Sequence, residues 1–167
     1  AEVYRIGILV RGSGYEPAVD GFKSKMAEFG LVEGKNVSYD TRFVSAKEEL
    51  PQVVGDFIAN NVDLIHTYST PATQAAFLAT KDMSRPTPVV FGSMGDPLLS
   101  GVIKNIEHPG TNVTGVASLS TQLTAKRLQL LKDINPKIKA VAMPHTASEV
   151  GDVAANLSNA ERLIQSA

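Results

Sequence analysis

Two neighbouring segments decide the fold of this chain: Leu64-Ile65-His66-Thr67-Tyr68-Ser69-Thr70-Pro71-Ala72-Thr73-Gln74-Ala75-Ala76 and Pro88-Val89-Val90-Phe91-Gly92-Ser93-Met94-Gly95-Asp96-Pro97. In each, a short apolar run is followed by small, polar, turn-forming residues, and a helix-like segment lies between the two runs. This alternation predicts an α/β fold, an open parallel sheet flanked by helices. Because the carboxyl ends of parallel strands lie at one edge, both polar loops should meet where such sheets bind ligands.

The helix that follows the first of these strands begins with the features of an anion site. Thr70 can cap it with a hydroxyl, and Pro71 suits the first helical position because it needs no backbone partner there. The first helical amides then point into the crevice beside Ser69 and Thr70, where a carboxylate or phosphate would bind. On the facing loop, Asp96 offers a negative charge to a positive group. Opposite charges a short distance apart suit a zwitterion such as an amino acid.

Periodicity predicts the remaining elements. Val19, Phe22 and Met26 fall on one face of a helix, and alternating polar and apolar residues at 37–43 predict a strand near the sheet edge. The expected strands cover 4–10, 37–43, 64–68, 88–91, 113–116 and 140–143, and the expected helices cover 17–29, 48–60, a segment from Thr70, 121–134 and 152–165.

Three parts are expected along the chain. Residues 1–118 should form an N-terminal α/β lobe, 119–139 a crossover helix and hinge, and 140–167 the start of a second, truncated α/β lobe. A lone strand and helix bury too little apolar area to be stable by themselves. The strand at 140–143 should therefore seed a second sheet or pair with another chain.

Composition restricts the classes of function. A chain of 167 residues is long enough for a sizeable core. The formal net charge of −1 and the lack of a basic run give no reason to expect a nucleic-acid partner. Without cysteine there is no disulfide framework or thiol chemistry. No apolar run is long enough to span a bilayer. The start, Ala1-Glu2-Val3, resembles what remains after cleavage of a signal peptide, so export is an expectation.

A glycine loop follows the first strand. Gly12-Ser13-Gly14 matches the beginning of a dinucleotide fingerprint, but Pro17 stands at the third glycine position. A ligand-contacting or simply turn-forming loop is therefore favoured over nucleotide binding. The chain has no G-x-x-x-x-G-K-[ST] phosphate loop, and its three histidines lack metal-ligand spacing. We expect neither a cofactor nor a metal.

An enzyme is the alternative function. The segment 91–95 is a near match to a nucleophile elbow in which Phe91 replaces the first glycine. A flavodoxin-like or hydrolase-like α/β enzyme would use Ser93, His66 and Asp96. His66 lies within an apolar strand, where a core or rim role is favoured over a catalytic base, and no spacing supports a triad. Tyr15 and Tyr68 either stack on a ligand or lie on a partly exposed rim.

A set of co-linear motifs carries a family resemblance: Ile6-Gly7-Ile8-Leu9, Gly21-Phe22-Lys23, Leu31-Val32-Glu33-Gly34-Lys35-Asn36-Val37, Val62-Asp63-Leu64-Ile65, Thr70-Pro71-Ala72, Pro88-Val89-Val90-Phe91, Asp96-Pro97 and His108-Pro109-Gly110-Thr111-Asn112-Val113-Thr114-Gly115-Val116. In this order and spacing, residues 4–142 resemble the solute-binding proteins of ABC transporters, in the family whose characterised members include tryptophan and tyrosine binders. The match fades beyond Ala142, where members tend to show an Asn-Pro-Ser-Glu-like loop and this chain reads Met143-Pro144-His145-Thr146-Ala147-Ser148-Glu149.

The resemblance implies two periplasmic-binding-protein-like (type I) lobes joined by a hinge, with an amino-acid-like ligand enclosed between them and no catalysis. Members have about twice this length, which fits two domains. This chain thus resembles the first lobe and the beginning of the second. The family also implies a membrane permease as partner and a periplasmic or other extracytoplasmic location, with lipid anchoring before processing as one route. The first-lobe ligand contacts carried over are Ser13, Tyr15, Ser69, Thr70, Ala72, Ser93 and Asp96.

Overall fold

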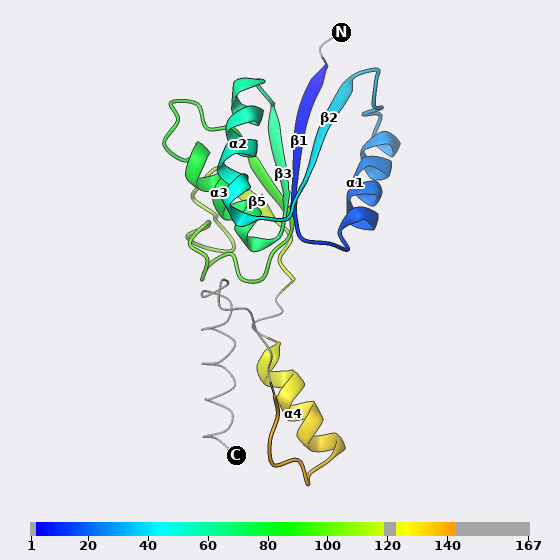
Figure 1. Ribbon diagram of the computed structural model, residues 1–167, viewed down its shortest axis with the longest axis vertical. Helices are drawn as coiled ribbons and strands as arrows, with labels where there is room; N and C mark the ends of the chain where they lie inside the picture. Colours follow the sequence, from blue (N-terminus) through cyan, green and yellow to red (C-terminus); the bar gives the residue numbers. More distant parts are fainter. Residues whose placement is uncertain (1–2, 119–122, 143–167) are drawn as a thin grey trace.

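The computed structural model describes residues 3–118 and 123–142, in which strands and helices alternate except at residues 94–112, a loop as the sequence predicts (Figure 1). The elements are β1 (Tyr4–Arg11), α1 (Glu16–Glu28), β2 (Val37–Val44), the short 3-10 helix η1 (Lys47–Glu49), α2 (Leu50–Ala59), β3 (Leu64–Tyr68), α3 (Thr70–Thr80), β4 (Val89–Ser93), β5 (Val113–Gly115) and α4 (Thr124–Ile134).

The described strands form one parallel sheet in the order β2-β1-β3-β4-β5. β2 lies at an edge, which confirms the prediction from its alternating pattern. The order reverses between β1 and β3, because the chain first adds a strand on one side of β1 and then continues on the other. Such a switch point opens a crevice at the carboxyl ends of the two strands. The loops after β1 and β3 flank that crevice.

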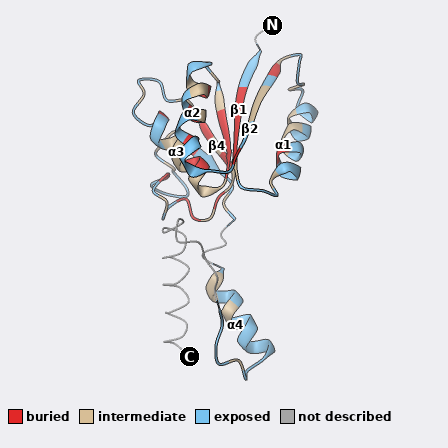
Figure 2. Cartoon of the chain, in the orientation of Figure 1, coloured by how far each residue is buried: buried red, intermediate tan, exposed pale blue. Residues whose placement is uncertain are grey.

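Helices cover both faces of the sheet, and the buried residues concentrate on its strands (Figure 2). On one face, Leu9 and Ile65 belong to the same core cluster as Phe57 of α2 and Ala76 of α3. On the other face, strand β1 packs with Val19 of α1. Burial of this apolar area is the main favourable contribution to folding, at about 25 cal/mol per Å². The rigid sheet between these layers holds the strand-end loops in place.

Helix α4 lies beyond the carboxyl edge of the sheet (Figure 1). None of its residues is buried, and the apolar side chains of Leu130, Leu131 and Ile134 are exposed. The predicted strand at 140–143 is wrong for residues 140–142, which form no strand, while Met143 lies outside the described residues. An isolated strand has no partner for its backbone groups, and the described chain offers residues 140–142 none. The predicted helix at 152–165 also lies outside the described part, and the division into lobes stays a prediction.

Candidate ligand-binding site

Two polar loops meet at the carboxyl edge of the sheet, as expected from the sequence. Strands β3 and β4 are neighbours, and the amide of Ser69 donates to the carbonyl of Ser93 at 2.9 Å. The amide of Gly95 in turn donates to the hydroxyl of Thr70 at 3.3 Å. The start of α3 and the loop after β4 are therefore joined by hydrogen bonds. Ser93 is the last residue of β4 rather than part of the loop.

The predicted cap of α3 is wrong in detail. Ser69 is the N-cap residue, Thr70 and Pro71 are the first two helical residues, and no side chain caps the helix. The hydroxyl of Thr70 is directed to the Gly95 amide instead. Ser69 has φ 88° and ψ 151°, a region that non-glycine residues rarely occupy and that costs about 1–3 kcal/mol. Its buried Oγ has no hydrogen-bond partner among the described residues.

Two threonines that the sequence analysis did not single out fix the first turn of α3. The hydroxyl of Thr73 donates to the carbonyl of Ser69 at 3.0 Å, and the hydroxyls of Thr67 and Thr73 are 2.9 Å apart. Both residues are buried. Because the Thr73 proton is used on Ser69, Thr67 is the donor in the second bond. A threonine at the fourth helical position is a weak sequence signal, since Thr often bonds back to a carbonyl one turn earlier.

Asp96 is 6% exposed, and part of its hydrogen-bonding capacity is used locally. Its Oδ1 accepts the amides of Leu98 at 2.9 Å and Leu99 at 3.0 Å. Its backbone carbonyl accepts the hydroxyl of Ser100 at 2.6 Å. The residue therefore orders the turn that follows β4, a role the sequence analysis missed. Aspartate before a turn is a common signal for such bonds. Both amide bonds to this turn use Oδ1 and neither uses Oδ2.

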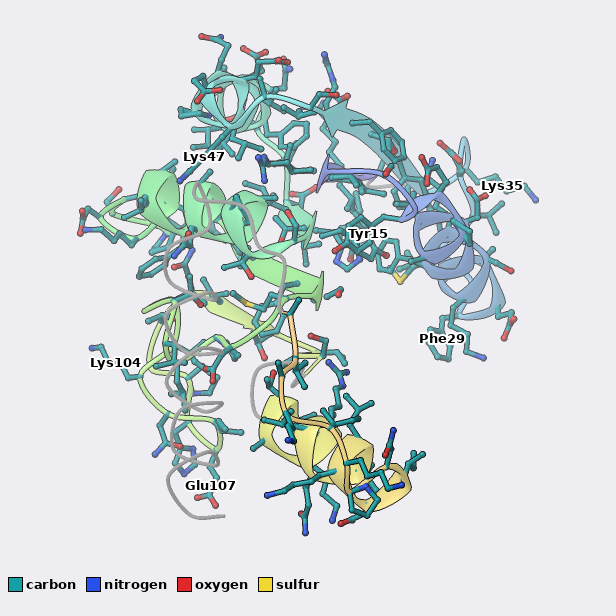
Figure 3. All side chains as sticks on the ribbon, turned by 60° about the horizontal axis from the view of Figure 1, so that its bottom comes forward. Tyr15, Phe29, Lys35, Lys47, Lys104 and Glu107 are labelled. Carbon is teal, nitrogen blue, oxygen red and sulfur yellow. The ribbon has the colours of Figure 1, made fainter. Side chains whose placement is uncertain are left out.

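The other predicted contacts fall into different environments. Ser13 is exposed, and Tyr15 is half-buried at the start of α1. In Figure 3, Tyr15 lies between α1 and the sheet. Ala72 is fully buried in the core, so its side chain does not reach the edge surface. Tyr68 is 3% exposed, which makes it a core residue rather than a rim residue or a direct ligand contact.

The geometry does not support the enzyme alternative. His66 is 4% exposed, and its Nδ1 donates to the carbonyl of Val90 at 2.8 Å. Its ring stacks on Phe22 of α1 at 4.2 Å between centroids. Within the described residues, His66 Nε2 has no hydrogen-bond partner. A catalytic base must bond its nucleophile, and no bond to Ser93 or Asp96 is formed there.

The environment of His66 makes the stability of the fold depend on pH. Burial lowers its pKa below the ordinary value near 6.5, although the bond to Val90 acts in the opposite direction. The unfolded chain thus takes up a proton at this residue more readily than the folded protein. The contribution of the neutral His66 to the free energy of unfolding is fully present above about pH 6.5. It is lost as the pH falls from there toward the pKa of His66 in the folded protein. We expect a loss of at most about 1.4 kcal/mol per pH unit.

Urea unfolding between about pH 5 and 7.5 checks this expectation. His66→Gln should flatten the pH dependence, since glutamine can still donate to Val90 but does not titrate. His108→Gln is the matched control, because His108 is exposed. If the unfolding free energy of His66→Gln changes with pH as steeply as that of the parent, the pH dependence comes from other groups.

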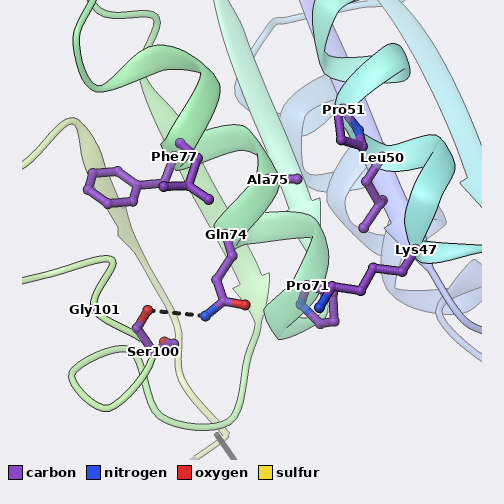
Figure 4. A pocket seen from close by; sticks show the side chains of 10 residues that line it. Lys47, Leu50, Pro51, Pro71, Gln74, Ala75, Phe77, Ser100 and Gly101 are labelled. Atoms are coloured by element: carbon purple, nitrogen blue, oxygen red, sulfur yellow. Dashed lines mark hydrogen bonds between the residues drawn. The ribbon is translucent and has the colours of Figure 1, made fainter. Parts of the chain in front are cut away.

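A shallow groove of about 360 Å³ lies between α2 and α3 (Figure 4). Its lining includes Lys47, Pro51, Leu78 and Pro71. Gln74 joins it to the loop after β4 by donating to the carbonyl of Ser100 at 3.1 Å. The groove shares Pro71 with the start of α3 and Ser100 with the turn after β4, but none of Ser69, Thr70, Ser93 and Asp96 lines it. The groove is therefore distinct from the edge at which the residues Ser69, Thr70, Ser93 and Asp96 lie.

Histidine, aspartate and glutamate side chains in the described part of the chain do not gather into a group able to hold a metal ion. None of the described helices combines the length and hydropathy needed to cross a membrane.

Comparison with known proteins places the chain in one family. The model for ABC transporter substrate-binding proteins matches residues 5–167. A tyrosine-binding protein from Clostridioides difficile is 33% identical over 150 residues, which is 87% of this chain and 41% of that protein. A conserved domain protein from Vibrio cholerae is similar in structure, with a TM-score of 0.81 and 28% identity over 99% of this chain and 53% of that chain. A Streptococcus pneumoniae domain in complex with L-Trp gives a TM-score of 0.78 and 26% identity, over 96% of this chain and 54% of that chain.

The chain spans about half the length of these solved neighbours. Their similarity, together with the five-stranded parallel sheet, confirms the predicted periplasmic-binding-protein-like fold class. The tyrosine-binding relative and the neighbour in complex with L-Trp confirm the resemblance to amino-acid binders. With the family match extending over residues 5–167, the chain belongs to the ABC transporter substrate-binding protein family.

Proposed function

We propose that this chain contributes the first lobe of the solute-binding component of an ABC importer. In this proposal, a small amino acid-like ligand is enclosed between two lobes and released by opening of the hinge. The observation that carries the proposal is the meeting of the α3 start and the Asp96 loop, joined by the bond from Gly95 to Thr70. A positive helix end and a carboxylate there suit the two charges of a zwitterion. The relatives that bind tyrosine and L-Trp favour an aromatic amino acid.

The ligand carboxylate would lie at the start of α3. A carboxylate gains about 0.3–1 kcal/mol at an exposed helix N-terminus and up to about 2 kcal/mol in a partly buried one. The unpartnered Oγ of Ser69 would donate to it, and a hydrogen bond to a charged group contributes about 1.5–3 kcal/mol. The proposed contacts are Ser13, Tyr15, Ser69, Thr70, Ala72, Ser93 and Asp96, with Ala72 contributing its backbone amide because its side chain is buried.

The membrane context belongs to the same proposal. The family match suggests a permease as partner and an extracytoplasmic, periplasmic location, with lipid anchoring as one means of retention. Residues 1–118 would form the first lobe, 119–139 the crossover and 140–167 the start of the second lobe. Binding without chemical turnover follows from this role, since transport requires release of the unchanged ligand.

Calorimetric titration of the full-length protein with the natural amino acids tests the proposal. We expect saturable binding of one ligand per protein, strongest for an aromatic amino acid, and recovery of the unchanged ligand afterwards. Chemical conversion of the bound compound would overturn the proposal in favour of an enzyme. Absence of saturable binding to any amino acid would overturn the ligand class.

A further inference from the structure

A column of aromatic rings extends from the carboxyl edge of the sheet into the core beneath α1. Tyr15 contacts Tyr68, with 5.6 Å between ring centroids and 39° between planes. Tyr68 makes an edge-on contact with His66 at 4.7 Å, and His66 stacks on Phe22 at 4.2 Å. Only the outermost ring, that of Tyr15, lies at the start of α1 beside the switch point between β1 and β3.

Tyr68 is held from several sides. Its hydroxyl donates to the carbonyl of Ala18 in the first turn of α1, at 3.0 Å. Its ring lies against the backbone of Gly92, where an added Cβ would be 2.6 Å from Tyr68 Cε1 and 3.1 Å from His66 Cε1. Real Cβ atoms essentially never lie within 3.0 Å of another heavy atom, so the approach to Tyr68 would force a shift. The ring can occupy this position only because residue 92 has no side chain.

Gly92 is also the irregular residue of strand β4. Thr67 pairs with Phe91 and Tyr68 pairs with Ser93, so Gly92 is the extra residue at the register shift. Such a bulge commonly redirects a neighbouring side chain next to a functional site. An isolated glycine in a strand pattern signals either a bulge or a close approach, and Gly92 provides both.

The identity of residue 15 is not explained by helix formation. Tyr15 is the N-cap residue of α1, and its side chain makes no capping hydrogen bond. Serine, threonine, asparagine or aspartate is strongly preferred at this position, and losing such a cap costs about 1 kcal/mol. What distinguishes Tyr15 is that its ring, at the helix start, lies against the ring of the buried Tyr68.

We propose that Gly92 and Tyr68 are positioning residues that hold the ring of Tyr15 as a platform for the side chain of an aromatic ligand. This inference rests on the proposed function and adds an orientation to it. The charged part of the ligand lies toward α3 and Asp96, and its ring lies toward α1. Stacked aromatic pairs contribute beyond the area they bury, and a support that is already rigid loses little entropy on binding.

A double-mutant cycle in the full-length protein tests the inference, with L-tyrosine and L-tryptophan as probes. Gly92→Ala should weaken their binding about tenfold, because the displaced Tyr68 ring moves Tyr15. In a Tyr15→Ala background, the same substitution should cost less than about twofold, since the platform is already absent. Gly55→Ala is the matched control, because a Cβ at Gly55 meets nothing within 4 Å. Equal losses from Gly92→Ala in both backgrounds would overturn the inference.

A second variant and a ligand-free measurement keep the test independent of folding and of ligand identity. If Gly92→Ala does not fold, Tyr68→Phe replaces it, because this variant keeps the ring and removes only the hydrogen bond to Ala18. Tyr68→Phe should weaken binding about threefold in the parent protein. It should not weaken binding in the Tyr15→Ala background. Near-ultraviolet circular dichroism is sensitive to the surroundings of tyrosine rings, and these 167 residues contain four tyrosines. The Tyr15-dependent signal, the difference between the parent and Tyr15→Phe, should shrink in the Gly92→Ala or Tyr68→Phe background.

The outcomes separate the inference from the proposed function. Unchanged affinity in Tyr15→Ala, with the parent still binding L-tyrosine, would overturn the platform and leave the solute-binding role intact. A parent protein that binds no amino acid would overturn the proposed function and the ligand platform with it. The circular dichroism would then still test whether Gly92 and Tyr68 position the ring of Tyr15. A Tyr15-dependent signal that is unchanged in the Gly92→Ala or Tyr68→Phe background would overturn that positioning role as well.

Discussion

Asp96→Asn is expected to weaken amino-acid binding at least about tenfold, equivalent to ~1.4 kcal/mol. In the proposed site, the ammonium of the ligand pairs with the carboxylate oxygen of Asp96 that does not hold the turn. Removing the charge would leave an enclosed ammonium without a charged partner while its desolvation cost remains. Thr70→Ala should cost less, because the amides at the start of α3 still face the ligand carboxylate. Calorimetric titration of the full-length variants measures both losses.

Asparagine is the informative replacement because Asp96 also has a structural role. Its Oδ1 accepts the amides of Leu98 and Leu99, and alanine would remove those bonds together with the charge. Asparagine keeps an oxygen acceptor at that position. Ser100→Ala is the control for the turn, since it removes the hydroxyl bond to the Asp96 carbonyl without changing any charge. If Asp96→Asn binds as tightly as the parent, the zwitterion model is wrong and a neutral solute replaces it.

Much of the fold was predictable because it depends on local patterns. The apolar runs and the turn residues between them placed the five strands of the sheet to within a few residues. The alternating residues of β2 correctly predicted an edge strand, since only one face of such a strand needs to be apolar. The meeting of the Ser69 and Gly95 loops also followed, because neighbouring parallel strands bring their carboxyl ends to one edge.

The details of the site depend on register, which sequence patterns do not provide. The shift at Gly92 sets Ser93 opposite Tyr68, and Gly95 then donates to Thr70, whose hydroxyl was expected to cap α3. The burial of Tyr68 similarly results from packing between α1 and the bulge rather than from its neighbours in sequence. Residues 140–142 of the strand expected at 140–143 form no strand, because an apolar run forms a strand only where a partner is available and the described residues offer none.

Gly115→Ala is expected to lower the free energy of unfolding by about 3 kcal/mol. Gly115 pairs with Phe91 across β4 and β5, and a Cβ there would lie 2.1 Å from the Phe91 carbonyl oxygen and 2.7 Å from its ring. That carbonyl also accepts the amide of Val116 at 2.9 Å, so relief of the clash separates the two strands. The φ of 154° at Gly115 adds backbone strain for any residue with a side chain.

The separation of β4 from β5 in Gly115→Ala should also disturb the carboxyl edge of the sheet, because the amide and hydroxyl of Ser118 donate to the Met94 carbonyl there at 2.8 and 3.0 Å. Gly34→Ala is the matched control: its φ is 80°, but an added Cβ meets nothing within 4 Å, so only the backbone cost of about 1–2 kcal/mol applies. Urea unfolding gives the two losses, and hydrogen exchange at residues 113–116 localises the first. Equal losses in the two variants would mean that β5, at the edge of the described sheet, moves aside without disturbing β4. The Asp96 loop would then be supported by β4 alone.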